Sequence, residues 1–349
     1  MKKKTKAGSG EEFREPGFWE TVKEAVFGAR RSLDCIQVEV SSRCPGRCTY
    51  CPHTTQREKW LLRDMDMATY GRLWPLMRRS GRVHLQGWGE PLLNPAFFDM
   101  AALARKAGCQ VSTTTCGLRM DRELALRIVE SGIDIVAFSL AGTDTASNAE
   151  RHGVDFDRVC EAITTLQAVR RERMGVHLEV HFAYLMLAST MEAVRGLPEL
   201  MQRLGVHAAV ISTLDYIAEP GLEAEAFTPQ ETDKLARAAA ILNETAAEAR
   251  RLGLGFHYEL PSPAACGTGC RENIGRSLYV SADGGISPCV YVNVPADMPD
   301  PRHRVFGNVR DQNPLEIWES ADFRRFRERL ATGNPDLPCQ TCPKRFMEG

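Results

Sequence analysis

The strongest constraint on the fold is a regular alternation between short apolar runs and longer amphipathic segments, from about residue 33 to 217. The apolar runs have the length of buried strands and lie at 35–40, 82–88, 110–115, 134–140, 176–186 and 208–213. The segments between them carry apolar residues at three- and four-residue spacing, which predicts helices at 65–79, 96–108, 121–132, 155–173 and 190–205. Strands that alternate with helices form a parallel sheet with right-handed crossovers. Six such units, against the eight of a complete barrel, predict an α/β fold of the partial (β/α)6 TIM-type barrel class.

The sequence after this alternation predicts two further structural regions. Thr228 and Glu231 have the spacing of a capping box and open a strongly helical stretch. After residue 261 the pattern changes to a hairpin around 283–285 and a helix over 315–333, which predicts a small C-terminal α+β module. We therefore expect an N-terminal extension (1–32), the barrel (33–227), a helical linker (228–260) and the C-terminal module (261–349).

Charge and cysteine content narrow the function classes. The formal net charge of -1 gives no bulk field that would attract nucleic acid or an anionic membrane. The basic start MKKKTK is not followed by an apolar signal-peptide region, and no apolar run is long enough for a transmembrane helix. Twelve cysteines without an export signal favour a reducing cytoplasm, where grouped cysteines more often bind metal than form disulfides. We expect a cytoplasmic protein that binds neither nucleic acid nor membrane.

The first cysteine group is the segment 41-SSRCPGRCTYCPH-53, with thiols at Cys44, Cys48 and Cys51. It follows the first strand, so it lies at the carboxyl end of the sheet, where barrel active sites are built. A structural zinc site usually takes four ligands in two pairs, and His53 is the only local candidate for a fourth. An iron–sulfur cubane normally takes four thiolates, so three would leave one iron open for a ligand. The spacing favours an iron–sulfur cluster over zinc.

The same segment resembles the hallmark of the radical SAM superfamily, C-x3-C-x-φ-C with an aromatic residue, here Tyr50, at φ. The resemblance implies a [4Fe-4S] cluster whose open iron chelates the amino and carboxylate groups of S-adenosylmethionine (SAM). It also implies reductive cleavage of SAM to a 5′-deoxyadenosyl radical, and a flavodoxin- or ferredoxin-type electron donor.

The segment 86-QGWGEP-91 is similar to the Gly-Gly-Glu-Pro segment of that family, with Trp88 between the two glycines. The resemblance implies that Gly89, Glu90 and Pro91 receive the amino group of SAM. Glycine lets the backbone approach a ligand, and the Glu90 carboxylate can accept hydrogen bonds from an ammonium group.

Ser139 and Arg151 are placed as in sulfatase-maturase-like relatives, where such residues contact the ribose and the carboxylate of SAM. An arginine suits this role because its guanidinium can bind a carboxylate through two parallel hydrogen bonds.

The second cysteine group lies in the C-terminal module. Cys270, Gly284 and Cys289 resemble the opening of the SPASM module that many radical SAM enzymes carry, and Cys339 and Cys342 form C-x2-C. No cysteine follows Cys342, which implies the shortened "twitch" form with one auxiliary [4Fe-4S] cluster.

The resemblance implies a complete thiolate set for this cluster, formed by Cys270, Cys289, Cys339 and Cys342. Cys266 could substitute for Cys270. Four cysteines also suit a structural zinc site, and the sequence leaves that alternative open.

Relatives with such modules modify peptides, proteins or cofactors, or oxidise small molecules. The resemblance favours a maturase, including those linked to tungsten oxidoreductases. The alternatives are a small-molecule dehydrogenase of the aminoglycoside-alcohol type and a metal-binding scaffold that does not cleave SAM. Candidates for polar groups at the hydrogen-abstraction site lie near strand ends and are His53, His181, Tyr184, Asp215 and Tyr216.

Overall fold

The computed structural model describes residues 31–118, 120–173, 175–262 and 269–347. Cys266 and nearly all of the expected N-terminal extension lie outside the described residues. Within them, no helix is long and apolar enough to cross a membrane.

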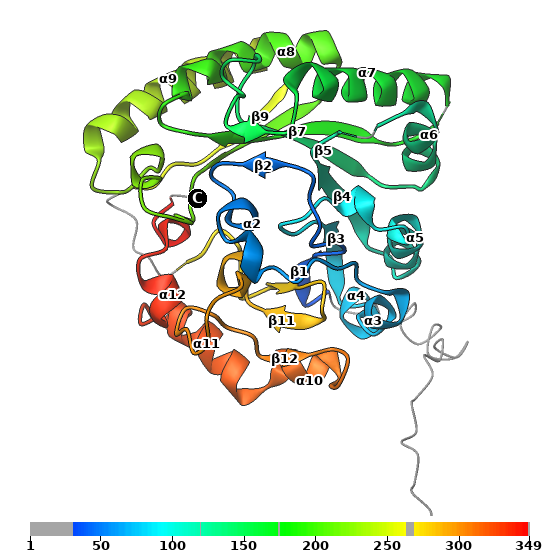
Figure 1. The fold of residues 1–349 in the computed structure, drawn as a ribbon, viewed down its shortest axis with the longest axis vertical. Coiled ribbons are helices and arrows are strands. Elements are labelled where there is room, and N and C mark those ends of the chain that lie inside the picture. Colours follow the sequence, from blue (N-terminus) through cyan, green and yellow to red (C-terminus); the bar gives the residue numbers. More distant parts are fainter. Residues whose placement is uncertain (1–30, 119, 174, 263–268, 348–349) are drawn as a thin grey trace, which may run out of the picture.

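All six predicted strands are present, and neighbours pair in parallel. They are β1 (Leu33–Val38), β3 (Ser80–Leu85), β4 (Gln110–Thr115), β5 (Ile135–Leu140), β7 (Glu179–Met186) and β8 (Ala208–Thr213). The parallel strands curve around an interior with helices on the outside, as Figure 1 shows, which confirms the partial-barrel prediction.

The helices between these strands cover the outer face of the sheet. They are α3 (Met67–Gly71), α4 (Trp74–Met77), α5 (Phe97–Lys106), α6 (Arg122–Glu130), α7 (Phe156–Glu172) and α8 (Leu197–Leu204). Two predicted helices are broken by proline. Pro75 opens α4, and Pro198 opens α8 after the 3-10 turn η3 (Met191–Gly196), because proline is tolerated only in the first turn of a helix.

The stretch expected as a helical linker adds to the barrel instead. Helix α9 (Thr232–Arg251) leads into β9 (Gly255–Tyr258), which pairs in parallel with β8. The capping box also differs from expectation, because α9 begins after Glu231. The Glu231 carboxylate accepts hydrogen bonds from the backbone N–H (3.0 Å) and hydroxyl (2.9 Å) of Thr228, which forms a turn before the helix.

The C-terminal module continues the same sheet. Strand β10 (Ser277–Val280) pairs in parallel with β1 on the side away from β3, and β11 (Gly285–Ser287) and β12 (Gly307–Asn308) follow in antiparallel pairs. The predicted hairpin is therefore present, with Gly284 at φ +91° in its turn. Within the described residues, one sheet of ten strands runs from the module through the barrel.

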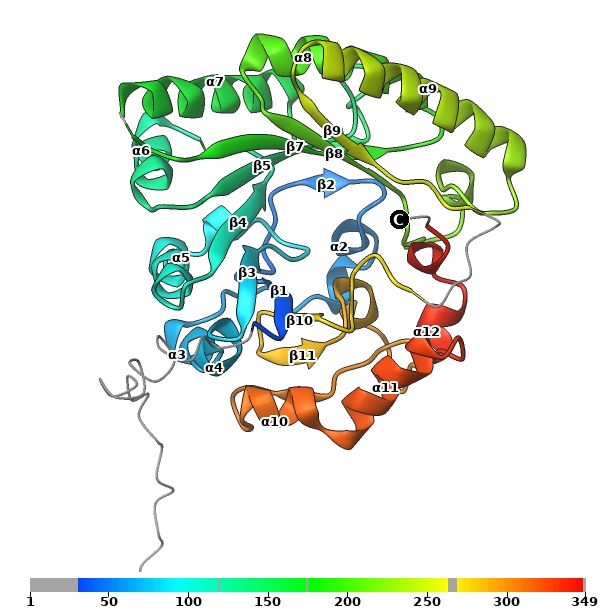
Figure 2. The ribbon, with the colours of Figure 1, turned by 180° about the vertical axis from the view of Figure 1, so that it is seen from behind.

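The predicted helix over 315–333 is divided in two. Helix α10 (Pro314–Glu319) ends before Ser320, whose side chain accepts a hydrogen bond from Phe323 N–H and caps α11 (Ala321–Ala331). With α12 (Leu337–Gln340), these helices lie on the side of the ring opposite α6 and α7 (Figure 2).

Two short elements lie inside the ring formed by the sheet and the module (Figure 1). The segment that carries the first cysteine group includes β2 (Arg47–Cys48) and α2 (Pro52–Thr55). The strand β6 (Arg151–His152), which follows β5, pairs with β2 in an antiparallel arrangement. This pairing holds the cysteine loop over the carboxyl ends of the barrel strands.

Candidate functional site

The three cysteines of the first group, Cys44, Cys48 and Cys51, lie in one short loop. A Cβ added at Gly46 would lie 3.6 Å from Cys44 Sγ and 3.9 Å from Cys48 Sγ, so both thiols face the same glycine. Backbone N–H groups of Gly46 and of His53 donate to the sulfurs of Cys44 and Cys51, respectively. Hydrogen bonds of this kind are typical of thiolates that hold iron–sulfur clusters and help to set their potential.

The protonation of these thiols fits a metal-binding role. Burial raises the pKa of Cys44 to about 11 and that of Cys51 to about 12, because desolvation disfavours the thiolate. A bound metal centre reverses this effect, since its positive charge deprotonates a coordinating thiol. The described residues contain no group of three or more His, Cys, Asp or Glu side chains spaced to hold a single metal ion.

Arg151 lies next to this turn with part of its hydrogen-bonding capacity unused. It is directly opposite Cys48 in the β2–β6 pair and is only 5% exposed. Its Nη2 donates to Ser139 Oγ (3.1 Å), whereas Nε and Nη1 have no hydrogen-bond partner among the described residues. Buried donors without a partner are costly. The unused N–H groups therefore fit an anionic ligand such as the carboxylate of SAM, and the structure brings Ser139, Arg151 and Cys48 together.

The segment that contains Glu90 packs against the start of the cysteine loop. Glu90 N–H donates to Arg43 O (2.7 Å), and a Cβ at Gly89 would lie only 2.1 Å from Ser41 O, so this position requires glycine. The Glu90 carboxylate accepts hydrogen bonds from Thr115 Oγ1 (2.8 Å), Cys116 N–H (2.7 Å) and Leu92 N–H (3.2 Å). A carboxylate has about four acceptor positions, so these donors fix it and leave room for an ammonium group.

The four cysteines expected to bind the auxiliary cluster also lie together. Cys339 is buried in the apolar cluster of Ile274, Phe326 and Leu330, and Cys270 and Cys289 pack against that cluster. Burial raises the pKa of Cys339 and of Cys342 to about 12, and the neighbouring Cys270 thiol adds to both rises. Backbone N–H groups of Glu272 and Ile274 donate to Cys270, and that of Lys344 donates to Cys342. Four buried thiols with such donors fit a fully ligated metal centre.

The candidate catalytic groups do not all lie together. His181 faces the barrel interior and donates from Nε2 to Glu179 Oε2 (2.7 Å), below the level of Ser139. Tyr184 is 1% exposed and lies on the opposite, helix-facing side of β7, because successive strand residues alternate in direction. His53 is buried, with Nε2–H donating to Ser42 O (2.8 Å), and burial lowers its pKa.

Asp215 and Tyr216 follow β8 at the carboxyl edge of the sheet. The Asp215 carboxylate forms a salt bridge of 3.1 Å with Lys344 of the C-terminal module. The ring of Tyr216 lies 6.2 Å from that of Trp88 and stacks on that of Tyr291 at 6.3 Å, between centroids. A cavity of about 970 Å³ is lined by Asp215, Tyr216 and Tyr291, with Leu214 and Phe227, and extends to Cys342.

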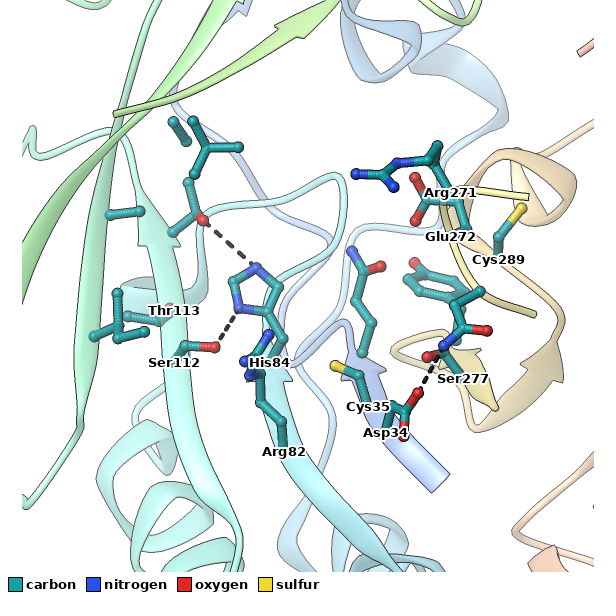
Figure 3. A pocket seen from close by; sticks show the side chains of 18 of the residues that line it. Asp34, Cys35, Arg82, His84, Ser112, Thr113, Arg271, Glu272, Ser277 and Cys289 are labelled. Atoms are coloured by element: carbon teal, nitrogen blue, oxygen red, sulfur yellow. Dashed lines mark hydrogen bonds between the residues drawn. The ribbon is translucent and has the colours of Figure 1, made fainter. Parts of the chain in front are cut away.

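A cavity of about 550 Å³, lined by polar and apolar residues, occupies the interior of the barrel and is here named the lumen cavity (Figure 3). Its strand wall carries Gln37, His84, Ser112, Thr114 and His181, and its opposite wall carries Arg271, Glu272 and Cys289 of the module. His84 Nδ1 hydrogen-bonds with Ser112 Oγ (2.8 Å), and burial lowers the pKa of His84 to about 4. His84 is therefore a neutral hydrogen-bonding group at neutral pH. The alternating polar residues of 82-RVHLQ-86 and 110-QVSTT-114 are the sequence signal that could have identified this wall.

Two further residues connect the barrel to the module and were not anticipated. Glu39 is buried and accepts hydrogen bonds from Trp88 N–H (2.9 Å) and Ala282 N–H (3.2 Å), and burial raises its pKa to about 7. Trp88 donates from Nε1 to Val290 O (3.3 Å), directly after Cys289 in the chain. The SAM-side segment and the auxiliary cysteines are thus joined by hydrogen bonds.

Comparison with known families decides the class of this protein. The Radical SAM superfamily matches residues 38–197, and the SPASM family, an iron-sulfur cluster-binding domain, matches residues 270–343. The chain belongs to the radical SAM superfamily. It is a radical SAM enzyme of the SPASM type that uses SAM and [4Fe-4S] clusters, so the scaffold alternative is set aside.

Curated relatives of this radical SAM enzyme match most of its length. The PqqA peptide cyclase of Gluconobacter oxydans (strain 621H) is 25% identical over 321 residues, covering 89% of this chain and 82% of the relative. The tungsten-containing aldehyde ferredoxin oxidoreductase cofactor-modifying protein of Pyrococcus furiosus is 25% identical over 341 residues, covering 89% and 87%. Both names are those of maturases, the group that the sequence favoured.

Solved structures share the fold of this radical SAM enzyme. Streptococcus suis SuiB bound to S-adenosylmethionine superimposes with a TM-score of 0.64 at 14% identity, covering 88% of this chain and 73% of SuiB. Native anSMEcpe with bound AdoMet gives 0.62 at 17% identity, covering 85% and 84%.

Proposed function

We propose that this radical SAM maturase oxidises a peptide or a protein segment, one side chain of which enters the lumen cavity. The observation that carries the proposal is the position of this cavity, between the inward-facing strand residues and the auxiliary residue Cys289. A volume of about 550 Å³ lies in the usual range for ligand pockets. A substrate in this space would lie beside the auxiliary residue Cys289.

The proposal assigns roles to the residues of the site. Cys44, Cys48 and Cys51 hold the SAM-binding cluster, next to Tyr50 in the same loop. Arg151, supported by Ser139, binds the carboxylate of SAM. Glu90, in the segment Gly89–Pro91, binds its amino group and is held by Thr115, Cys116 and Leu92. When bound, SAM and this cluster supply a 5′-deoxyadenosyl radical that abstracts hydrogen from the substrate. The unpaired guanidinium N–H groups and the open position on the Glu90 carboxylate support these assignments.

The auxiliary cluster is assigned to Cys270, Cys289, Cys339 and Cys342, which leaves no role for Cys266. We assign the auxiliary module to residues 261–347 and extend the barrel to residue 260, because α9 and β9 continue its pattern. A cytoplasmic flavodoxin- or ferredoxin-type protein is the proposed electron donor, since the cleavage of SAM needs one electron at low potential.

The lining of the lumen cavity favours a peptide over an aminoglycoside. A polycationic sugar needs unpaired carboxylates, because a buried cation must be compensated. Among the described residues that line the cavity, each carboxylate already has a cationic partner. Asp34 pairs with Arg276 (2.7 Å), and Glu272 pairs with Lys344 (3.4 Å). Apart from Arg82, the strand wall offers neutral donors and acceptors, which suit amide groups and uncharged side chains.

The test uses transfer of deuterium from substrate to SAM. Cells of the source organism are grown in deuterated medium, and their extract is divided by size into a macromolecular fraction and a small-molecule filtrate. Each fraction is incubated with reconstituted enzyme, SAM and a low-potential reductant, and the deuterium content of 5′-deoxyadenosine is measured by mass spectrometry. We expect transfer from the macromolecular fraction and none with a Cys44/Cys48/Cys51→Ala variant. Transfer from the filtrate alone would contradict the proposal and favour a small-molecule dehydrogenase.

A second variant tests the lumen cavity itself. Ala137 faces the cavity from β5, so Ala137→Phe should fill it and abolish deuterium transfer while SAM cleavage persists. Ala102→Phe, on the exposed side of α5, is the matched control. Unchanged transfer in the Ala137→Phe enzyme would place the substrate elsewhere.

A further inference from the structure

A buried ion triad connects the barrel with the auxiliary module. Lys344 lies in the 3-10 turn η6 (Pro343–Arg345), directly after Cys342, and its side chain is 13% exposed. Its Nζ is 3.1 Å from Asp215 Oδ2 and 3.4 Å from Glu272 Oε1. Asp215 follows strand β8 of the barrel and its side chain is 1% exposed, whereas Glu272 lies two residues after Cys270.

The charges of this triad lie beside the auxiliary cysteines. Lys344 is two residues after Cys342, and Glu272, which pairs with it, is two residues after Cys270. The Lys344 side chain and the Cys342 sulfur also share one turn, because the backbone N–H of Lys344 donates to that sulfur. A charge in such a buried position is only weakly screened.

We propose that Lys344, Asp215 and Glu272 set the reduction potential of the auxiliary cluster. The inference rests on the assignment of that cluster to Cys270, Cys289, Cys339 and Cys342. Reduction adds one electron to a centre that its four thiolates already make anionic. The Lys344 ammonium therefore stabilises the reduced cluster and raises the potential, whereas the two carboxylates lower it.

The triad also changes the role of Asp215. The Asp215 side chain is 1% exposed, accepts a hydrogen bond from Thr213 Oγ1 (2.8 Å) and pairs with Lys344 of the module. Asp215 is therefore a positioning residue, which holds the Lys344 charge beside the cluster from the barrel side. It is one of the residues that line the cavity of about 970 Å³, so the cluster potential is linked to that part of the molecule.

The test is a redox titration followed by electron paramagnetic resonance. A Cys44/Cys48/Cys51→Ala background removes the SAM-binding cluster, so that only the auxiliary signal remains. In this background, Lys344→Met should shift the midpoint potential to lower values, and Asp215→Asn should shift it to higher values. Lys344→Arg, which keeps the positive charge, should stay close to the parent. The matched control is Lys234→Met, because Lys234 pairs with Glu231 at the start of α9.

Opposite shifts distinguish an electrostatic role from a structural one. If the triad only held the module in place, Lys344→Met and Asp215→Asn would both lower the iron content and would leave the potential of the remaining clusters unchanged. That result, or shifts of the same sign, would overturn the inference. If the Lys344→Met protein does not retain iron, the inference is still tested by the other two variants. The midpoint potential should rise in Asp215→Asn and stay unchanged in Lys344→Arg. If the parent Cys44/Cys48/Cys51→Ala protein held no iron, the assignment of the auxiliary cluster itself would be refuted. The deuterium-transfer experiment does not test that assignment, so the two failures can be told apart.

Discussion

Cys48 and Arg151 lie directly opposite each other across an antiparallel pair, although 102 positions separate them in the chain (151 − 48 − 1). This pair places a buried guanidinium with two unused nitrogen donors beside a cysteine of the radical SAM motif. The backbone pairing thereby couples the cysteine loop to a residue with the chemistry to hold the carboxylate of SAM.

Arg151→Met should weaken SAM binding. Hydrogen bonds to charged groups contribute about 1.5–3 kcal/mol, so the dissociation constant should rise by about tenfold to a hundredfold. Equilibrium dialysis of reconstituted enzyme with labelled SAM measures this change. Arg158→Met on the exposed face of α7 is the control, and equal affinity in the two variants would remove Arg151 from the SAM site.

The two cysteine groups should bind iron independently. Replacing Cys44, Cys48 and Cys51 by alanine should remove about half of the iron and abolish formation of 5′-deoxyadenosine, because the open iron position is lost. Replacing Cys339 and Cys342 by alanine should remove the other half but leave SAM cleavage in place. Iron and sulfide analysis, with chromatography of the nucleoside product, checks both. Zinc instead of iron in the second group would revive the structural-zinc alternative.

Stability should depend on the protonation of Glu39. Burial raises its pKa to about 7 in the folded state, above the value of an unfolded chain, so the folded state binds this proton more tightly. The folded state is therefore penalised as the pH rises, and the penalty is complete above the folded pKa. Between pH 6 and pH 8 the free energy of unfolding should fall by about 1 kcal/mol relative to Glu39→Gln. Denaturant titrations of the wild type and of Glu39→Gln between pH 6 and pH 8 measure this change. If the free energy of unfolding had the same pH dependence in both proteins, the prediction would be wrong.

Gly87 should tolerate no side chain. A Cβ at this position would lie 2.4 Å from the Cβ and Cγ of Glu39, inside the contact that also holds Trp88. Gly87→Ala should cost about 1–3 kcal/mol of stability, the usual cost of overpacking. Chemical denaturation measures the loss. Gly275→Ala, where a Cβ meets nothing within 4 Å, should be neutral or slightly stabilising, because alanine reduces the entropy of the unfolded chain. A similar loss in both variants would contradict the overpacking argument.

The barrel strands could be predicted because their apolar runs are long and end clearly. The same pattern could not show that β9 and β10 extend the sheet, since Gly255–Tyr258 and Ser277–Val280 are short and depend on partners distant in the chain. The interruptions of the predicted helices at Pro75 and Pro198 could be predicted, because proline is excluded from the interior of a helix. The interruption at Ser320 depends on a side-chain cap that the sequence pattern did not indicate.

The motif residues were identifiable because the resemblance fixes their spacing, and the structure places them in two groups. Residues outside a motif were not identifiable in the same way. Lys344 follows Cys342 closely, but only the fold brings Asp215 to it. Tyr184 and His181 are near each other in sequence, but strand alternation separates them onto opposite faces of the sheet. Which residues meet in one site depends on three-dimensional packing, and the spacing of residues in the sequence does not show it.

The parallel pairing of β1 with β10 has a consequence for synthesis of the chain. β1 leaves the ribosome well before its second partner, which begins at Ser277, about 240 positions later. Until that segment emerges, one edge of β1 lacks its hydrogen-bond partner, and exposed strand edges are sites of misassembly. The barrel therefore completes its sheet only late in translation.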